Sequence, residues 1–219
     1  MKKTDLFCVV HSLSVYLCFS CASTGQEDEK VLPSHCNPLS EGPCLTPWPS
    51  SFYLKEDSTT VTGYRVNYPT EAMPKNRDGK PIDPARFNVL DGFSIGSQVV
   101  VYFKAGVSKE GLPKVEDLEY SISDQSPIWI LEHDTGVRVP FFAETDANAK
   151  GSFVPALIIR PQVPLKHNSR YIVVIKEGLK NASGASLQPP DPFLRLRDKE
   201  STSRETLRAE GERLKAVFE

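Results

Sequence analysis

Proline is the residue that most constrains this chain, which contains 18 prolines and only 2 methionines among 219 residues. A proline ring fixes φ and removes the backbone N–H donor, so it interrupts both helices and strands. The length allows one domain of ordinary size plus a tail, and hardly two domains. We therefore expect many short elements separated by turns, and not long helices.

The charge balance argues against one class of partner. The chain has 26 lysines and arginines against 28 aspartates and glutamates, and its formal net charge is −2. Because the basic residues are dispersed among nearly equal numbers of carboxylates, electrostatic capture of nucleic acid is not expected. Hydrophobic residues make up 39% and charged residues 25% of the chain, which is the composition of a folded protein.

The first twenty residues are predicted to be a secretory signal peptide. Lys2 and Lys3 form a positive start, and a mainly apolar stretch runs from Leu6 to Phe19. A membrane-spanning helix needs roughly 20 apolar residues, so this stretch is too short to span comfortably. Its length is that of the hydrophobic region of an export signal, although Asp5 is unusual in such a leader.

The residues at the predicted cleavage point, Leu17-Cys18-Phe19-Ser20-Cys21, resemble a bacterial lipoprotein signal. The resemblance implies that Cys21 receives diacylglycerol, and two or more acyl chains would hold the protein stably at a membrane of the bacterial cell envelope. Residues 21–35 would then be a polar tether. Two alternatives stay open: a plain signal peptide cut near Ala22 or Ser23, and a chain that is not exported.

The cysteines support export. Of five cysteines, two lie in the predicted leader and a third is Cys21, which leaves Cys36 and Cys44 as a pair. The loop between them contains Pro and Gly, and we predict that they form a disulfide in an oxidising compartment. Two free thiols are the alternative. Zinc is not expected, because His35 is the only histidine nearby.

The mature chain is predicted to be all-β, with an Ig-like β-sandwich over 93–197 and a proline-rich irregular segment over 36–92 that packs on it. Asp134-Thr135-Gly136 is predicted to be a turn that joins two strands in a hairpin. The predicted strands are short and are separated by turns, and no segment of helix length and period clearly separates them. This pattern favours a sandwich over a βαβ fold. The apolar runs that predict these strands are 98–103, 128–131, 137–142, 157–161 and 171–175.

Residues 198–219 differ from the rest and predict a helix at the carboxyl end. The segment is highly charged, and Thr202 with Glu205 fits a capping box. One face of this helix is apolar and would need a covering partner, either a hydrolase domain or another protein. That face is formed by Leu207, Leu214, Val217 and Phe218.

Residues 36–198 resemble the amino-terminal region of large bacterial secreted or lipid-anchored proteins, in which an Ig-like domain precedes a lipase-like α/β-hydrolase domain. In those proteins a helix connects the two domains. The resemblance implies that this chain is the β module and that its connecting helix, 198–219, is truncated, without the hydrolase domain. The motifs that carry the resemblance are 44–51, 76–79, 91–94, 135–144, 157–161 and 170–173.

Gly92-Phe93-Ser94-Ile95-Gly96 fits the G-x-S-x-G pattern of a hydrolase nucleophile. That chemistry needs the serine on a sharp turn from a strand into a helix, together with an acid and a histidine. Here a strong β run follows Ser94, and the available histidines are His133, beside Asp134, and the isolated His167. We interpret Ser94 as a turn serine and predict no catalytic residue.

Three further patterns could mark a functional site but also have a structural explanation. The acidic residues between Asp117 and Asp146 lack the spacing of a calcium loop, so we interpret them as surface charge and predict no metal or other cofactor. Trp129 lies in an apolar run and is predicted to be a core residue. For Trp48 both alternatives stay open, a core residue or one that stacks on a ligand. Asn181 begins a glycosylation motif that a bacterial lipoprotein would leave unmodified.

Taken together, the sequence predicts an exported, lipid-anchored, non-catalytic module of the cell envelope, serving as a binding or spacer domain of a lipase-like protein. Its expected partners are a membrane, through the anchor at Cys21, and a hydrolase domain or other protein at the tail helix. The alternative is a fragment of a serine ester hydrolase, or a weak hydrolase of the same type that depends on Ser94.

Overall fold

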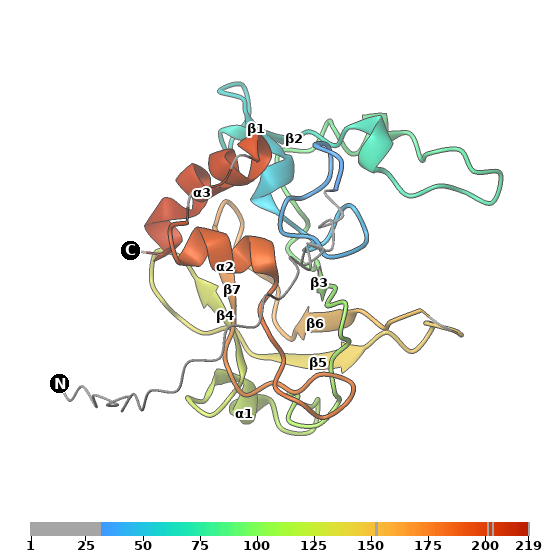
Figure 1. Cartoon of the computed structure of the whole chain (residues 1–219). Helices are drawn as coiled ribbons and strands as arrows, with labels where there is room; N and C mark the ends of the chain where they lie inside the picture. Colours follow the sequence, from blue (N-terminus) through green and yellow to red (C-terminus); the bar gives the residue numbers. More distant parts are fainter. Residues whose placement is uncertain (1–31, 152, 201, 203, 219) are drawn as a thin grey trace, which may run out of the picture. The chain divides into compact units, whose positions relative to one another are not determined.

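The computed structural model describes residues 32–151, 153–200, 202 and 204–218, which belong to a compact unit that spans Leu32–Glu219 (Figure 1). The predicted signal peptide, Cys21 and most of the predicted tether lie outside the described residues. Every strand in the described part has only three to five residues, as the proline content predicts. The strands are β1 (Leu54–Glu56), β2 (Tyr64–Val66), β3 (Val99–Val101), β4 (Ile128–Glu132), β5 (Phe141–Thr145), β6 (Leu157–Pro161) and β7 (Tyr171–Ile175).

These strands form small antiparallel sheets, so the β-rich character expected from the sequence is confirmed. β1 pairs with β2, β4 pairs with β7, and β6 lies between β3 and β5. Helices precede the first strand, lie between some of the strands and follow the last strand. They are the 3-10 helices Ser51–Tyr53, Thr70–Ala72 and Pro84–Arg86, and the α-helices α1 (Leu118–Ile122), α2 (Asp191–Arg197) and α3 (Glu205–Phe218).

The main core comes from strands whose side chains alternate between a buried and a less buried face. In β4, Ile128 and Ile130 are buried while Trp129 between them is only half-buried. β5 and β6 show the same alternation. Each large apolar side chain removed from water contributes about 1.5–3 kcal/mol. The buried members are Phe103, Val107, Leu112, Ile128, Ile130, Val139, Phe141, Ala143, Leu157, Ile159 and Leu179.

The hairpin predicted between 128–131 and 137–142 is correct only over its first part. The turn forms with Gly136 at φ +67°, and the Val139 amide donates to the Ile130 carbonyl over 2.9 Å. Beyond this point Pro140 has no N–H to continue the ladder. The chain then leaves β4, and Phe141 starts β5, which pairs with β6. β4 instead takes β7 as its full-length partner.

A second, smaller core lies within residues 36–92 and includes the β1–β2 hairpin. Trp48 packs against this core, and its indole Nε1 donates to the Tyr68 hydroxyl over 2.8 Å. The Trp48 backbone also exchanges two hydrogen bonds with Val100 of β3. Trp48 therefore ties the proline-rich segment to the three-stranded sheet. The buried members are Tyr53, Val66, Tyr68, Ala72 and Met73.

The disulfide predicted between Cys36 and Cys44 is confirmed, with the two sulfurs 2.02 Å apart. The closed loop is held by the Tyr53 hydroxyl, which accepts from the Asn37 amide (2.8 Å) and donates to the Cys44 carbonyl (2.9 Å). Asn37 is fully buried and Tyr53 is 2% exposed. Burial raises the pKa of the Tyr53 phenol to about 12.

The carboxyl-terminal segment forms two short helices that lie against each other (Figure 1). Gly211 of α3 approaches α2 so closely that an added Cβ would lie 3.1 Å from Leu196 Cδ2. Leu207, on the predicted apolar face, is fully buried. The predicted capping box does not form, because Thr202 Oγ1 accepts from the Arg204 amide (3.2 Å) before the helix begins at Glu205.

Replacing Tyr53 with phenylalanine should destabilise the domain. Tyr53→Phe removes the hydrogen bonds that the hydroxyl makes with the Asn37 amide and the Cys44 carbonyl, while the Asn37 amide keeps the Cys44 carbonyl as an acceptor at 2.9 Å. Each lost hydrogen bond contributes about 0.5–1.5 kcal/mol. We expect a lower midpoint of urea unfolding with an unchanged slope. Tyr64→Phe is the matched control, since Tyr64 is 38% exposed. Equal midpoints for the two variants would contradict the role assigned to the Tyr53 hydroxyl.

Candidate functional site

Ser94 lies in an exposed turn that leads into a strand. Its Oγ accepts from the Gly96 amide over 3.2 Å, and β3 begins soon afterwards at Val99. A nucleophile elbow would require a helix after the serine and free amides for an oxyanion. Ser94 is therefore a turn serine, as predicted from the sequence.

The candidate acid and base are not joined to this serine. His133 Nδ1 lies 2.7 Å from Asp134 Oδ1, and both residues sit in the turn after β4. His167 is exposed in the loop before β7. Within the part of the chain that the structure describes, no hydrogen bond connects Ser94 to either histidine. The described residues therefore do not form a serine–histidine–acid triad around Ser94.

The acidic residues of the middle section are divided among separate local contacts. Glu132 is held by Lys166, Asp124 pairs with Arg138 and Glu144 pairs with Arg160. Others cap a helix or a turn, as Asp117 does for the Tyr120 amide. These carboxylates do not form a group of three metal-ligand side chains in the described residues. Glu132 is buried, with 8% of its surface exposed, whereas the other carboxylates named here are paired or capping surface charges.

One group with metal-ligand chemistry does occur in the described residues. The His35 ring nitrogen and the sulfurs of Cys36 and Cys44 lie within 4.8 Å of one another. The two sulfurs are bonded to each other, whereas a metal would need them as thiolates. The group therefore acts as a disulfide cross-link in this structure.

Trp129 is half-buried on the outer face of β4, so its predicted place in the core is wrong. Alternation puts it opposite Ile128 and Ile130. The Arg138 guanidinium carbon lies 4.0 Å and Lys176 Nζ 3.9 Å from the centre of the indole ring. Such cation–π contacts stabilise by about 0.5–2 kcal/mol.

The sequence contained a signal for this cluster of Trp129, Arg138 and Lys176. Arg138 alternates with the apolar residues Val137 and Val139, and Trp129 alternates with buried isoleucines. Period-two spacing alone would place Arg138 and Trp129 on outward positions of neighbouring segments. Lys176 joins them only because β7 pairs with β4, which the sequence did not predict.

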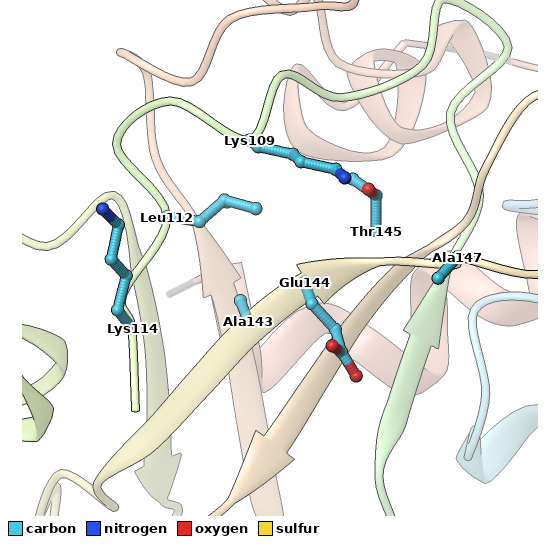
Figure 2. Close-up of a pocket in the computed structure, with 7 residues that line it drawn as sticks. All are labelled: Lys109, Leu112, Lys114, Ala143, Glu144, Thr145 and Ala147. Carbon is cyan, nitrogen blue, oxygen red and sulfur yellow. The ribbon is translucent and has the colours of Figure 1, made fainter. Parts of the chain in front are cut away.

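Neither of two hollows in the described surface combines a nucleophile with a histidine. The first, of ≈ 230 Å³, lies beside β5, and its lining includes Lys109 and Lys114 (Figure 2). Glu144 also lines it but pairs with Arg160. The second, of ≈ 420 Å³, is lined by Glu41, Phe103, Lys104, Ala105, Asn181, Ser186, Leu187, Gln188 and Pro189.

Comparison of the chain with family models finds no match, and comparisons with curated proteins and with solved structures find none either. Among the described residues, no helix has the length and apolar character needed to cross a bilayer.

Substituting Ser94 should not change ester hydrolysis. We expect the wild-type chain, Ser94→Ala and the exposed-turn control Ser183→Ala to release p-nitrophenol from a short-chain ester at the same background rate. The reason is that Ser94 lacks a base in hydrogen-bond contact. A rate that disappears only in Ser94→Ala would support the hydrolase alternative.

Stability should fall at acidic pH partly through Glu132. Hydrogen bonds from Lys166 (2.7 and 2.8 Å) and Thr135 (2.7 Å) hold the pKa of this carboxyl below its ordinary value of 4.5. The group therefore stabilises the folded state above pH 4.5, and that contribution is lost as pH falls through the lower folded-state pKa.

We expect the wild-type chain to lose more stability than Glu132→Gln when urea unfolding is compared at neutral pH and below the ordinary carboxyl pKa. The exposed Glu119→Gln variant is the control and should behave as the wild type does. An equal acid-induced loss in the Glu132→Gln variant and the wild type would rule out this role.

Proposed function

We propose that this chain is an exported, lipid-anchored, non-catalytic module of the bacterial cell envelope. The observation that carries the proposal is the Cys36–Cys44 disulfide within the folded domain. Structural disulfides persist in oxidising compartments and are rare in reducing ones. The predicted leader, 1–20, supports the same compartment from independent residues.

The proposed anchor is a lipid on Cys21. It is supported by the resemblance of residues 17–21 to a lipoprotein signal and by the polar residues that follow. The described domain begins at Leu32, so residues 21–31 would separate it from the bilayer. Diacylglycerol with a further acyl group would suffice for stable attachment.

The proposed finer fold is an Ig-like β-sandwich that belongs to a lipase-like protein. The passage of the chain at Pro140 from beside β4 into β5 is the kind of sheet switch that sandwiches use. The resemblance of residues 36–198 to the first domain of lipase-like proteins supports the same arrangement. The binding or spacer role rests on the lack of an assembled nucleophile, base and acid among the described residues.

Metabolic labelling tests the anchor directly. Expressed in a bacterial host, the wild-type chain should incorporate labelled palmitate and sediment with membranes. Cys21→Ser should lose both the label and the sedimentation, because the thiol that forms the thioether is gone. Cys18→Ser is the matched control within the leader and should keep the label. Unchanged labelling in Cys21→Ser would contradict the anchor.

A further inference from the structure

Strand β7 is an edge strand that the proposed function does not use. It pairs with β4 and with no other strand in the described part of the chain. Its sequence is Tyr-Ile-Val-Val-Ile, a β-forming run without proline, glycine or charge. Edge strands of this kind are usually blunted by a lysine, a proline or a bulge.

The hydrogen bonds at its ends fix which backbone groups face away from β4. The Lys176 amide donates to the Pro127 carbonyl over 2.8 Å, and the His133 amide donates to the Arg170 carbonyl over 2.9 Å. Antiparallel pairing alternates, so even-numbered residues of β7 bond to β4 and odd-numbered residues point outward. The outward N–H and C=O groups belong to Tyr171, Val173 and Ile175.

Loop segments satisfy some of the outward groups on the other edges of the two larger sheets. Val100 of β3 exchanges two hydrogen bonds with Trp48, and the Ala143 amide of β5 donates to the Pro113 carbonyl over 2.8 Å. The segment 137–139 closes the outer side of β4. These contacts satisfy edges that lack a neighbouring strand.

For the outward groups of β7, no hydrogen-bond partner occurs among the residues that the structure describes. All five residues of the strand are nevertheless half-buried. Backbone polar groups in such a position require water or another chain as partner. The edge thus presents a row of alternating donors and acceptors beside partly buried apolar side chains.

We propose that the β7 edge binds an extended polypeptide segment, which adds to the β4–β7 sheet as an antiparallel strand and places a carboxylate opposite Arg170. Main-chain hydrogen bonds would supply affinity, and side chains would supply specificity. Arg170 is exposed and forms no ion pair within the described residues. This inference rests on the proposed function, and it selects the binding role over the spacer role.

A second copy of this chain fits the edge less well. A twofold axis through Val173 would pair β7 with itself and bring Arg170 of each copy opposite Lys176 of the other. Like charges directly opposite each other on one face destabilise a strand pair. A segment with acidic ends has the complementary pattern.

The probe is the acetylated and amidated peptide Glu-Thr-Val-Thr-Val-Thr-Glu, whose glutamates would face Arg170 and Lys176. Binding to the full chain in detergent is measured by fluorescence anisotropy. We expect saturable binding that weakens about tenfold or more when the threonine amides are N-methylated, since these would donate to the edge. N-methylation of the valine amides, which face away, is the matched control and should have a smaller effect.

Variants of the protein provide a second line of evidence. Val173→Pro removes an outward N–H without removing a bond to β4, and should weaken binding about tenfold. Arg170→Glu should shift the preference to the same peptide with lysine at its seventh position, which would face residue 170, because the glutamate at the first position still faces Lys176. The Cys21→Ser variant should bind as the wild type does, so failure of the anchor and failure of this inference are separate results.

Three outcomes would overturn the inference. They are no binding by the wild-type chain, equal weakening by both N-methylated peptides together with unchanged preference in Arg170→Glu, and self-association that Val173→Pro abolishes. The last outcome, measured by sedimentation equilibrium, would assign the edge to a second copy.

Discussion

The structure depends on satisfying backbone hydrogen bonds in a chain whose strands are all short. Proline limits strand length, and short strands leave many edge groups that a longer ladder would have paired. Loop residues fill this need: Trp48 completes β3, Pro113 accepts from β5 and the segment after Gly136 completes β4. The loops are therefore part of the sheet structure, whereas the outward groups of β7 have no such partner among the described residues.

The disulfide loop meets the same demand at the start of the domain. The Tyr53 hydroxyl bonds to the Asn37 amide and the Cys44 carbonyl, and Asn37 is fully buried, so its amide needs partners from within the protein. The cross-link stabilises the fold by reducing the conformational entropy of the unfolded chain. It is also the feature of the described domain that bears on cellular location, because its persistence depends on redox conditions.

The described surface holds many of its charged side chains in ion pairs. Its charged groups satisfy one another in local pairs, as Glu132 does with Lys166 and Asp124 does with Arg138. A catalytic serine would need a base held against it, and Ser94 instead accepts a hydrogen bond from its own turn. The outward backbone groups of β7 have no hydrogen-bond partner among the described residues.

Sequence alone determined the short β-forming runs, the turn at Gly136 and the turn role of Ser94, because each depends on neighbouring residues. It also determined the Cys36–Cys44 pairing, because only two cysteines remain beyond the predicted leader and Cys21. Tertiary structure decided which strands pair. β4 joins β7, and Pro140 sends the chain into β5, because pairing depends on contacts between distant segments that local pattern does not encode. The same long-range pairing brings Lys176 to Trp129 and leaves the outer edge of β7 unpaired.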